Sequence, residues 1–184
     1  MVFHVVRKGR RADSGAFLRL LLALARFEKL EPPSGDARKR IISDIFAKKR
    51  LNLFVAEDEG KIVGYALYFY SYSSFLAKPV LYLEDLFVLE KNRKKGLGFA
   101  LFRRCAEEAI KEGCGRMEWA VLDWNENAIS FYERLGAKRL DEWQYYRLAE
   151  DGLKRTSRMK SNGTPLEDER RDRGIHRGVR NIVR

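Results

Sequence analysis

The hexapeptide Arg93-Lys94-Lys95-Gly96-Leu97-Gly98 lies between an apolar segment, residues 80–89, and an amphipathic segment, residues 96–112. The first segment reads as a strand, and the second has apolar positions at helical spacing. Glycines let a backbone approach a ligand closely, and the free amides and dipole at the start of a helix favour an anion. Three adjacent cations add countercharge. The segment therefore predicts a pyrophosphate cradle in a strand–loop–helix unit, although a basic turn without a ligand can have the same pattern.

Working outward from this unit, hydrophobic periodicity and turn residues divide the rest of the chain into strands and helices. The turn Asp58-Glu59-Gly60 indicates a hairpin between two of the strands. We expect strands at 2–7, 51–57, 61–71, 80–89 and 116–122, helices at 14–30, 36–49, 96–112 and 125–135, and one or two final strands within 138–148. This order combines an antiparallel meander with a β-α-β-α half, so the fold class is mixed α/β.

The length of 184 residues, with 45% hydrophobic and 34% charged residues, is typical of one globular domain. We place this domain at residues 1–150 and expect a flexible basic tail at 151–184. No apolar run reaches the ~18 residues needed to span a bilayer, and the N-terminus lacks a signal-peptide pattern. The two cysteines, Cys105 and Cys114, fit no metal spacing. We therefore expect a cytoplasmic protein with no membrane segment and no metal.

The net charge of +11 favours phosphate-bearing partners. The tail contributes +5, from ten Lys or Arg against five Asp or Glu between Asp151 and Arg184. A nucleic acid docked on this tail is therefore an alternative function of another class. The tail has no aromatic residue to stack on a base, so a solubilising extension is the preferred interpretation.

A second motif lies downstream: Asn125-Glu-Asn-Ala128-Ile-Ser-Phe131-Tyr132-Glu-Arg-Leu135-Gly136. Together with the hexapeptide, it resembles the two cofactor motifs of the GNAT superfamily of N-acetyltransferases, in spacing and in element type. The resemblance implies the GNAT fold, with a mixed, mostly antiparallel central sheet that splays between the fourth and fifth strands and is flanked by helices. It also implies acetyl-CoA as cofactor, with coenzyme A as product.

Three further segments are similar to diamine (spermidine/spermine) acetyltransferases: Leu24 to Glu28, Tyr82 to Val88 and Trp124 to Glu126. That resemblance implies acetylation of a primary amine on a small polyamine or lysine-like molecule, and a homodimer. The loop Ser71 to Lys78 lacks the acid that diamine enzymes tend to have there. A lysine analogue such as thialysine, another small amine, or a protein N-terminus or lysine therefore stays open as the acceptor.

The chemistry of amine acetylation explains the residue types that the resemblance selects. A lysine-like amine has a pKa of ~10.4 and must lose a proton before it attacks a thioester. The resemblance implies Glu84 as the base and Tyr132 as the acid that protonates the departing sulfur. It implies cofactor contacts from the fourth strand, the cradle and the segment after the fifth strand: Leu86, Phe87, Val88, Arg93, Lys94, Lys95, Gly96, Leu97, Gly98, Phe99, Asn125, Glu126, Asn127 and Ala128. It implies substrate contacts from Phe27, Glu28, Glu84, Asp85, Glu142 and Trp143.

Some of these residues also have plain structural interpretations. The spacing of Ala128, Phe131, Tyr132 and Leu135 fits a helix face in a core, so Tyr132 could serve packing alone. Glu84 and Asp85 could form an exposed strand end, yet buried acids in an apolar strand need a partner. No cysteine lies in a site motif, so we expect direct transfer without an acetyl-cysteine.

Overall fold

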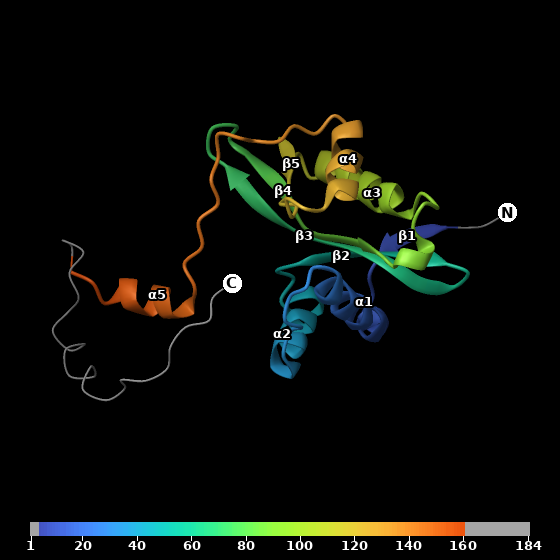
Figure 1. Cartoon of the computed structure of the whole chain (residues 1–184), viewed down its shortest axis with the longest axis horizontal. Helices are drawn as coiled ribbons and strands as arrows, with labels where there is room; N and C mark the ends of the chain where they lie inside the picture. Colours follow the sequence, from blue (N-terminus) through green and yellow to red (C-terminus); the bar gives the residue numbers. More distant parts are fainter. Residues whose placement is uncertain (1–3, 161–184) are drawn as a thin grey trace. The chain divides into compact units, whose positions relative to one another are not determined.

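The computed structural model describes residues 4–160. The chain divides into two compact units, Met1–Ser130 and Phe131–Arg184, each described by itself. The first unit holds a five-stranded sheet with strand order β1-β2-β3-β4-β5 (Figure 1). The strands are β1 (Val5–Lys8), β2 (Asn52–Asp58), β3 (Lys61–Ser73), β4 (Lys78–Val88) and β5 (Arg116–Glu118).

Neighbouring strands from β1 to β4 are antiparallel, and β5 runs parallel to β4. The pairing of β4 with β5 covers only Val80, Leu81 and Tyr82. Beyond Tyr82 the two strands separate, so residues 83–88 have no partner on the β5 side. The predicted splay between the fourth and fifth strands is confirmed, and it leaves backbone groups of β4 open to a ligand.

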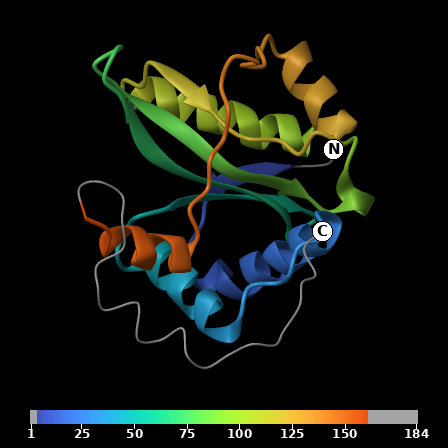
Figure 2. The same cartoon turned by 60° about the vertical axis from the view of Figure 1, so that its left-hand side comes forward.

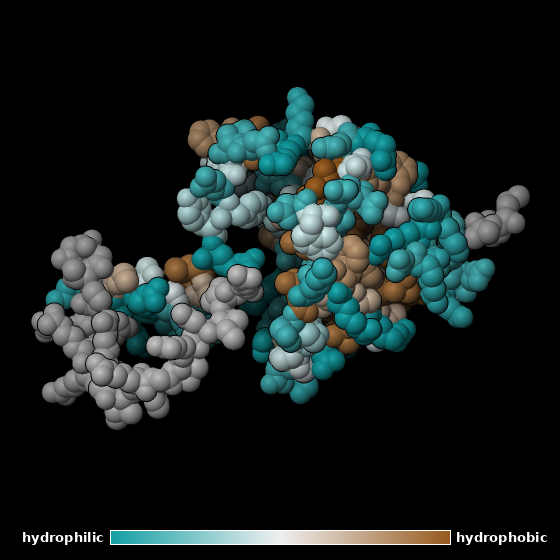
Figure 3. Space-filling model, viewed as in Figure 1, coloured by the Kyte–Doolittle hydropathy of each residue, from teal (hydrophilic) through white to brown (hydrophobic). Residues whose placement is uncertain are grey.

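Helices cover both faces of the sheet (Figures 1 and 2). On one face lie α1 (Ser14–Phe27) and α2 (Gly35–Phe46), and on the other lies α3 (Leu97–Lys111). The face drawn in Figure 3 is mostly hydrophilic, with hydrophobic patches among the polar residues. None of the helices among residues 4–160 has the length and apolar character needed to cross a membrane.

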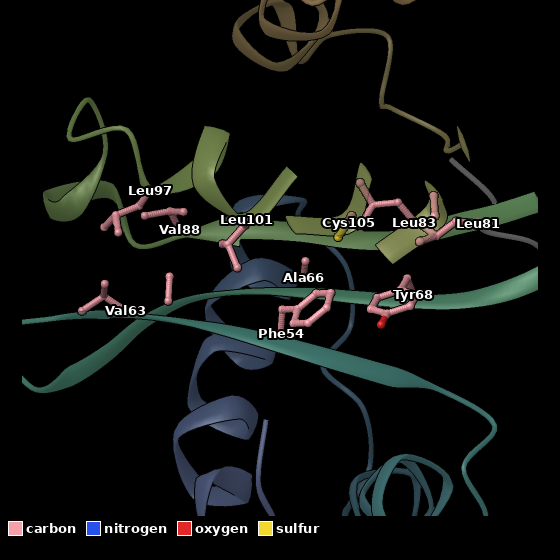
Figure 4. Packing of buried hydrophobic residues seen from close by; sticks show 12 residues of the cluster. Phe54, Val63, Ala66, Tyr68, Leu81, Leu83, Val88, Leu97, Leu101 and Cys105 are labelled. Atoms are coloured by element: carbon pink, nitrogen blue, oxygen red, sulfur yellow. The ribbon is translucent and has the colours of Figure 1, made fainter. Parts of the chain in front are cut away.

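Each face has its own hydrophobic core. Leu97, Leu101 and Cys105 point from α3 toward Phe54 and Tyr68 of the sheet (Figure 4). The opposite core packs α1 and α2 against the sheet and contains Phe17, Leu20, Leu24, Ile45, Leu53, Val55, Tyr65, Leu67 and Phe87. Because strand side chains alternate between faces, β2, β3 and β4 contribute to both cores.

Two expectations about the later part of the chain are wrong. The fifth strand spans three residues, not seven, and no strand forms within 138–148. Alternating aromatic residues make a strand only when a neighbour pairs with them and a core buries one face. Here Trp143 is 71% exposed and Tyr146 is 88% exposed, so neither condition is met.

The other predicted elements are confirmed, with small shifts at their ends. The helix expected at 125–135 is α4 (Glu126–Arg134), which crosses from the first unit into the second. A further helix, α5 (Glu150–Ser157), lies at the expected start of the basic tail. The rest of that predicted tail, residues 161–184, lies outside the described residues, and the domain boundary at residue 150 stays a prediction.

Candidate functional site

The cradle hexapeptide lies where the sequence placed it, between β4 and the first turn of α3. Gly96 is the N-cap of α3 and has a φ of 79°, a left-handed conformation that favours glycine. The amide of Ala100 donates to the Gly96 carbonyl at 2.9 Å, the first bond of the helix. The three amides between these residues therefore have no acceptor within the helix. A Cβ atom built on Gly98 would meet nothing within 4 Å, so the space beside these amides is open. The site fits a phosphate-bearing ligand.

The three cations of the hexapeptide have different surroundings. The Arg93 Nε donates to the Val88 carbonyl at 3.0 Å, and its guanidinium lies 4.9 Å from the centre of the Phe27 ring. The Lys95 Nζ lies 2.7 Å from Oδ2 of the buried Asp58. Lys94 is exposed and has a φ of 62°. Arg93 and Lys95 thus contact the protein, and Lys94 is directed to the solvent.

A β-bulge in β4 shapes the neighbouring part of the site. Leu67 pairs with Asp85 and Tyr68 pairs with Leu83, so Glu84 is an extra residue with no partner across the ladder. Before the bulge Leu83 packs into the core under α3, and after it Leu86 and Val88 do so. The alternation is shifted by one residue, which turns Asp85 to the α1 face.

Asp85 lies in an acidic cluster under the end of α1. Its Oδ2 accepts a hydrogen bond from the hydroxyl of the fully buried Tyr65 at 3.0 Å. The pKa of Asp85 is raised to about 6, mainly by burial; the Tyr65 hydrogen bond opposes this rise, and the nearby Glu84 and Glu28 add to it. Burial also raises the pKa of Glu28, the C-cap of α1. Glu28 and Glu84 lie close enough to Asp85 to act on its carboxyl group, and three neighbouring carboxyl groups form a site suited to a cation.

Aromatic rings border this cluster. The Phe27 ring lies 5.6 Å from the Trp124 ring, and the Arg93 guanidinium lies over Phe27 and Phe87. The structure therefore brings together the predicted Phe27, Glu28, Glu84 and Asp85 with the β4 residues Leu86, Phe87 and Val88. Glu84 is solvent-exposed, as a proton acceptor working through water would be.

The segment after β5 has a structural role that the motif did not reveal. The Asn125 side-chain oxygen accepts a hydrogen bond from the Ala128 amide at 3.3 Å, which caps the first turn of α4. Glu126 and Asn127 are exposed on that turn. Their predicted contacts with the cofactor stay predictions.

The remaining predicted site residues lie in the second unit. Tyr132 is half-buried on α4, with its ring 5.2 Å from that of Phe131. Glu142 and Trp143 are exposed in the segment without strands. The proposed roles of these three residues stay predictions.

Sequence reasoning missed Tyr65, Trp124 as part of the aromatic border, and Asp58. Tyr65 alternates onto the correct face of β3, but its register with Asp85 depends on the bulge at Glu84, which the sequence does not signal. Asp58 reads in the sequence as an ordinary turn residue before Gly60. Only the structure shows that the cradle loop packs over Asp58 and buries its side chain.

Known proteins resemble this chain in sequence and in fold. The acetyltransferase (GNAT) family matches residues 18–137. A thialysine N-epsilon-acetyltransferase of Bos taurus is 33% identical over 166 residues, which cover 84% of this chain and 97% of that protein. An L-ornithine N5-acetyltransferase of Arabidopsis thaliana is 46% identical over 98 residues, which cover 53% of this chain and 43% of that protein.

Solved structures share the fold. An integron cassette protein of V. cholerae superimposes with a TM-score of 0.71 at 22% identity, covering 84% of this chain and 97% of that one. An aminoglycoside N-acetyltransferase, solved in complex with CoA, superimposes with a TM-score of 0.67 at 21% identity, covering 80% and 95%.

Proposed function

The chain belongs to the acetyltransferase (GNAT) family, and we propose that it moves an acetyl group from acetyl-CoA directly to a primary amine of a small cationic molecule. The acidic cluster of Glu28, Glu84 and Asp85 is the observation that carries the substrate class. A cation is the ligand that lowers the electrostatic free energy of three neighbouring carboxyl groups.

The cradle supplies the binding residues for the cofactor. The amides of Leu97, Gly98 and Phe99 would hold the pyrophosphate, with Lys94 as countercharge. The open edge of β4 at Leu86, Phe87 and Val88 would pair with the pantetheine arm through backbone groups. When bound, acetyl-CoA supplies the acetyl thioester that the amine attacks.

The chain's own side chains handle the protons of this reaction. Asp85, held by Tyr65, binds the ammonium form of the substrate beside Glu84. Glu84 accepts the amine proton through a water molecule, so the nitrogen can form a bond to the acetyl carbon as the carbon–sulfur bond breaks. Tyr132 would donate its phenolic proton to the departing thiolate, and the second proton that the nitrogen loses as the amide forms would return through water to the Tyr132 oxygen.

Among amines, we propose a basic amino acid or its sulfur analogue over a polyamine. Two of the relatives are named for thialysine and L-ornithine, and one at 29% identity is a spermidine/spermine N(1)-acetyltransferase-like protein of Homo sapiens. The loop of residues 74–77 has no acid for a distant second amine. Trp124, in the aromatic border, is exposed, so a larger substrate could reach the site. An amine of a protein is therefore the competing acceptor.

An acetyl-transfer assay over matched amines tests this proposal. Thialysine, ornithine, lysine, spermidine and a lysine-containing peptide are each offered with acetyl-CoA, and products are identified by mass. We expect the highest kcat/KM for thialysine or ornithine. Preferred turnover of the peptide or of spermidine would overturn the substrate class, and transfer to none of the amines would overturn the activity.

A further inference from the structure

Asp58 is a buried carboxylate outside the reaction site, and it contacts the cradle loop at two places. Its side chain is 3% exposed. Its Oδ2 accepts hydrogen bonds from the Asn92 side-chain amide at 2.8 Å and from Lys95 Nζ at 2.7 Å. The His4 ring nitrogen Nδ1 lies 3.4 Å from the other oxygen. Nothing in the proposed reaction uses this carboxylate.

The contacts of Asp58 fall on the two ends of one short loop. Asn92 ends the 3₁₀ turn Glu90–Asn92 that follows β4, and Lys95 directly precedes the N-cap of α3. Between them Lys94 has a left-handed φ of 62°, in the region that favours glycine. Asp58 itself is fixed, because it closes the β2–β3 hairpin by pairing with Lys61. The end of the β2–β3 hairpin thus holds both ends of the loop.

We propose that Asp58 is a positioning residue that clamps residues 92–95, so that Lys94 and the first amides of α3 face the phosphates of the cofactor. In this arrangement Lys95 serves the loop and does not bind phosphate. The inference rests on the proposed cofactor and reaches beyond it, because it assigns different roles to the adjacent cations Lys94 and Lys95.

The electrostatics of the contact support a structural role for Lys95. Hydrogen bonds from Lys95 and Asn92 lower the pKa of Asp58, and Asp58 raises the pKa of Lys95, so the pair stays ionised. A buried carboxylate that lost its lysine to a ligand would be left without its countercharge, which is costly. Lys94, by contrast, has no ion-pair partner among residues 4–160.

The substitution Asp58→Asn distinguishes a clamp on the loop from a purely electrostatic effect of Asp58 on CoA binding. It removes a negative charge near the phosphate site, so charge alone would tighten CoA binding. Loss of the clamp would weaken it, because the loop must then be ordered at the expense of binding free energy. We expect CoA affinity, measured by calorimetry, to fall on the order of 10-fold.

A double-mutant cycle and a matched control complete the test. Lys95→Met should weaken CoA binding about as much as Asp58→Asn, and the double variant should be no weaker than either alone. Lys94→Met should weaken binding most at low salt, as expected for a direct phosphate contact. Asp13→Asn breaks another buried ion pair, with Arg7 at 2.7 Å, and should leave CoA affinity unchanged.

Hydrogen exchange on the protein without ligand gives a second readout. Asp58→Asn should speed the exchange of amides 93–97, and Asp13→Asn should not. If Asp58→Asn fails to fold, Asn92→Ala loosens one end of the loop without touching the charge pair and carries the same expectations. Unchanged or tighter CoA binding, additive effects in the cycle, or unchanged exchange would overturn the clamp. Absence of CoA binding by the unsubstituted protein would instead overturn the proposed cofactor, and the exchange measurement would still decide on the clamp.

Discussion

Asp85 combines a proposed role in binding with a cost in stability. Burial against α1 raises its pKa to about 6, compared with 3.8 for an ordinary aspartate. The folded protein therefore binds this proton more tightly than the unfolded chain does. The contribution of Asp85 to stability is complete below about pH 4 and is lost as the pH rises to about 6.

The raised pKa of Asp85 predicts how its substitution changes stability with pH. Asp85→Asn cannot ionise, so above pH 6 we expect it to be more stable than the unsubstituted protein by about 3 kcal/mol, from ~2 pKa units. The difference should shrink toward zero near pH 4, and activity should be lost because the cation site is weakened. Denaturant unfolding above pH 6 and near pH 4 measures the difference in free energy of unfolding between the two proteins. An equal difference at both pH values would show that folding does not shift the pKa of Asp85.

The second prediction concerns Tyr132. Tyr132→Phe keeps the ring and removes only the hydroxyl, so a general acid would lose about 10²–10⁴-fold in kcat. The thermal midpoint and the affinity for acetyl-CoA should stay the same. Turnover within a few-fold of normal, with both substrates saturating, would mean that Tyr132 serves packing alone.

At the element scale, the first turn of α3 separates two uses of glycine. Gly96 has a φ of 79°, so its conformation requires glycine, whereas Gly98 has an ordinary helical φ and open space around its Cβ position. The fold therefore does not explain Gly98, and close approach of a ligand does.

The prediction is that Gly98→Leu weakens CoA binding by at least 10-fold while the thermal midpoint is unchanged or raised, because glycine within a helix costs about 0.5–1 kcal/mol. Gly15→Leu is the matched control. Gly15 lies in the first turn of α1, where an added Cβ would meet only the Arg19 guanidinium, at 3.8 Å. That variant should bind CoA normally, and normal binding by Gly98→Leu as well would exclude the cradle.

At the scale of the whole molecule, the cradle and the acidic cluster both belong to the first unit. The cradle and the acidic cluster lie before Phe131, and only Tyr132, Glu142 and Trp143 follow it. A chain ending at Lys160 should therefore keep the CoA affinity of the full chain. A large loss of affinity in a truncated protein with a normal thermal midpoint would assign the removed residues a part in binding.

The predicted homodimer also belongs to this scale. Large apolar side chains are exposed at Tyr72 near the end of β3, at Phe75 in the turn that follows, and in the strand-free segment that contains Trp143 and Tyr146. Exposed aromatic residues of this kind are commonly covered by a partner. Sedimentation over a range of concentrations should show a dimer, and a monomer at every concentration would exclude it.

The sequence by itself determined the position of the glycine-containing loop before α3, the order of the elements through α4 and the family. Each depends on local spacing: glycines between a strand and a helix, and apolar residues at a period of two or 3.6. Leu97, Leu101 and Cys105 could be assigned to one buried face in this way.

Only the tertiary structure decided which charged side chains meet. Asp85 turns toward Tyr65 and Glu28 because a bulge at Glu84 shifts the alternation of β4, and a bulge has no signal in the residues that form it. Asp58 holds Asn92 and Lys95, although more than thirty residues separate them along the chain. In residues 138–148 the sequence favours a strand, but none forms, because no neighbouring strand pairs with this segment. Register and long-range packing set these contacts, and neither is encoded in local periodicity.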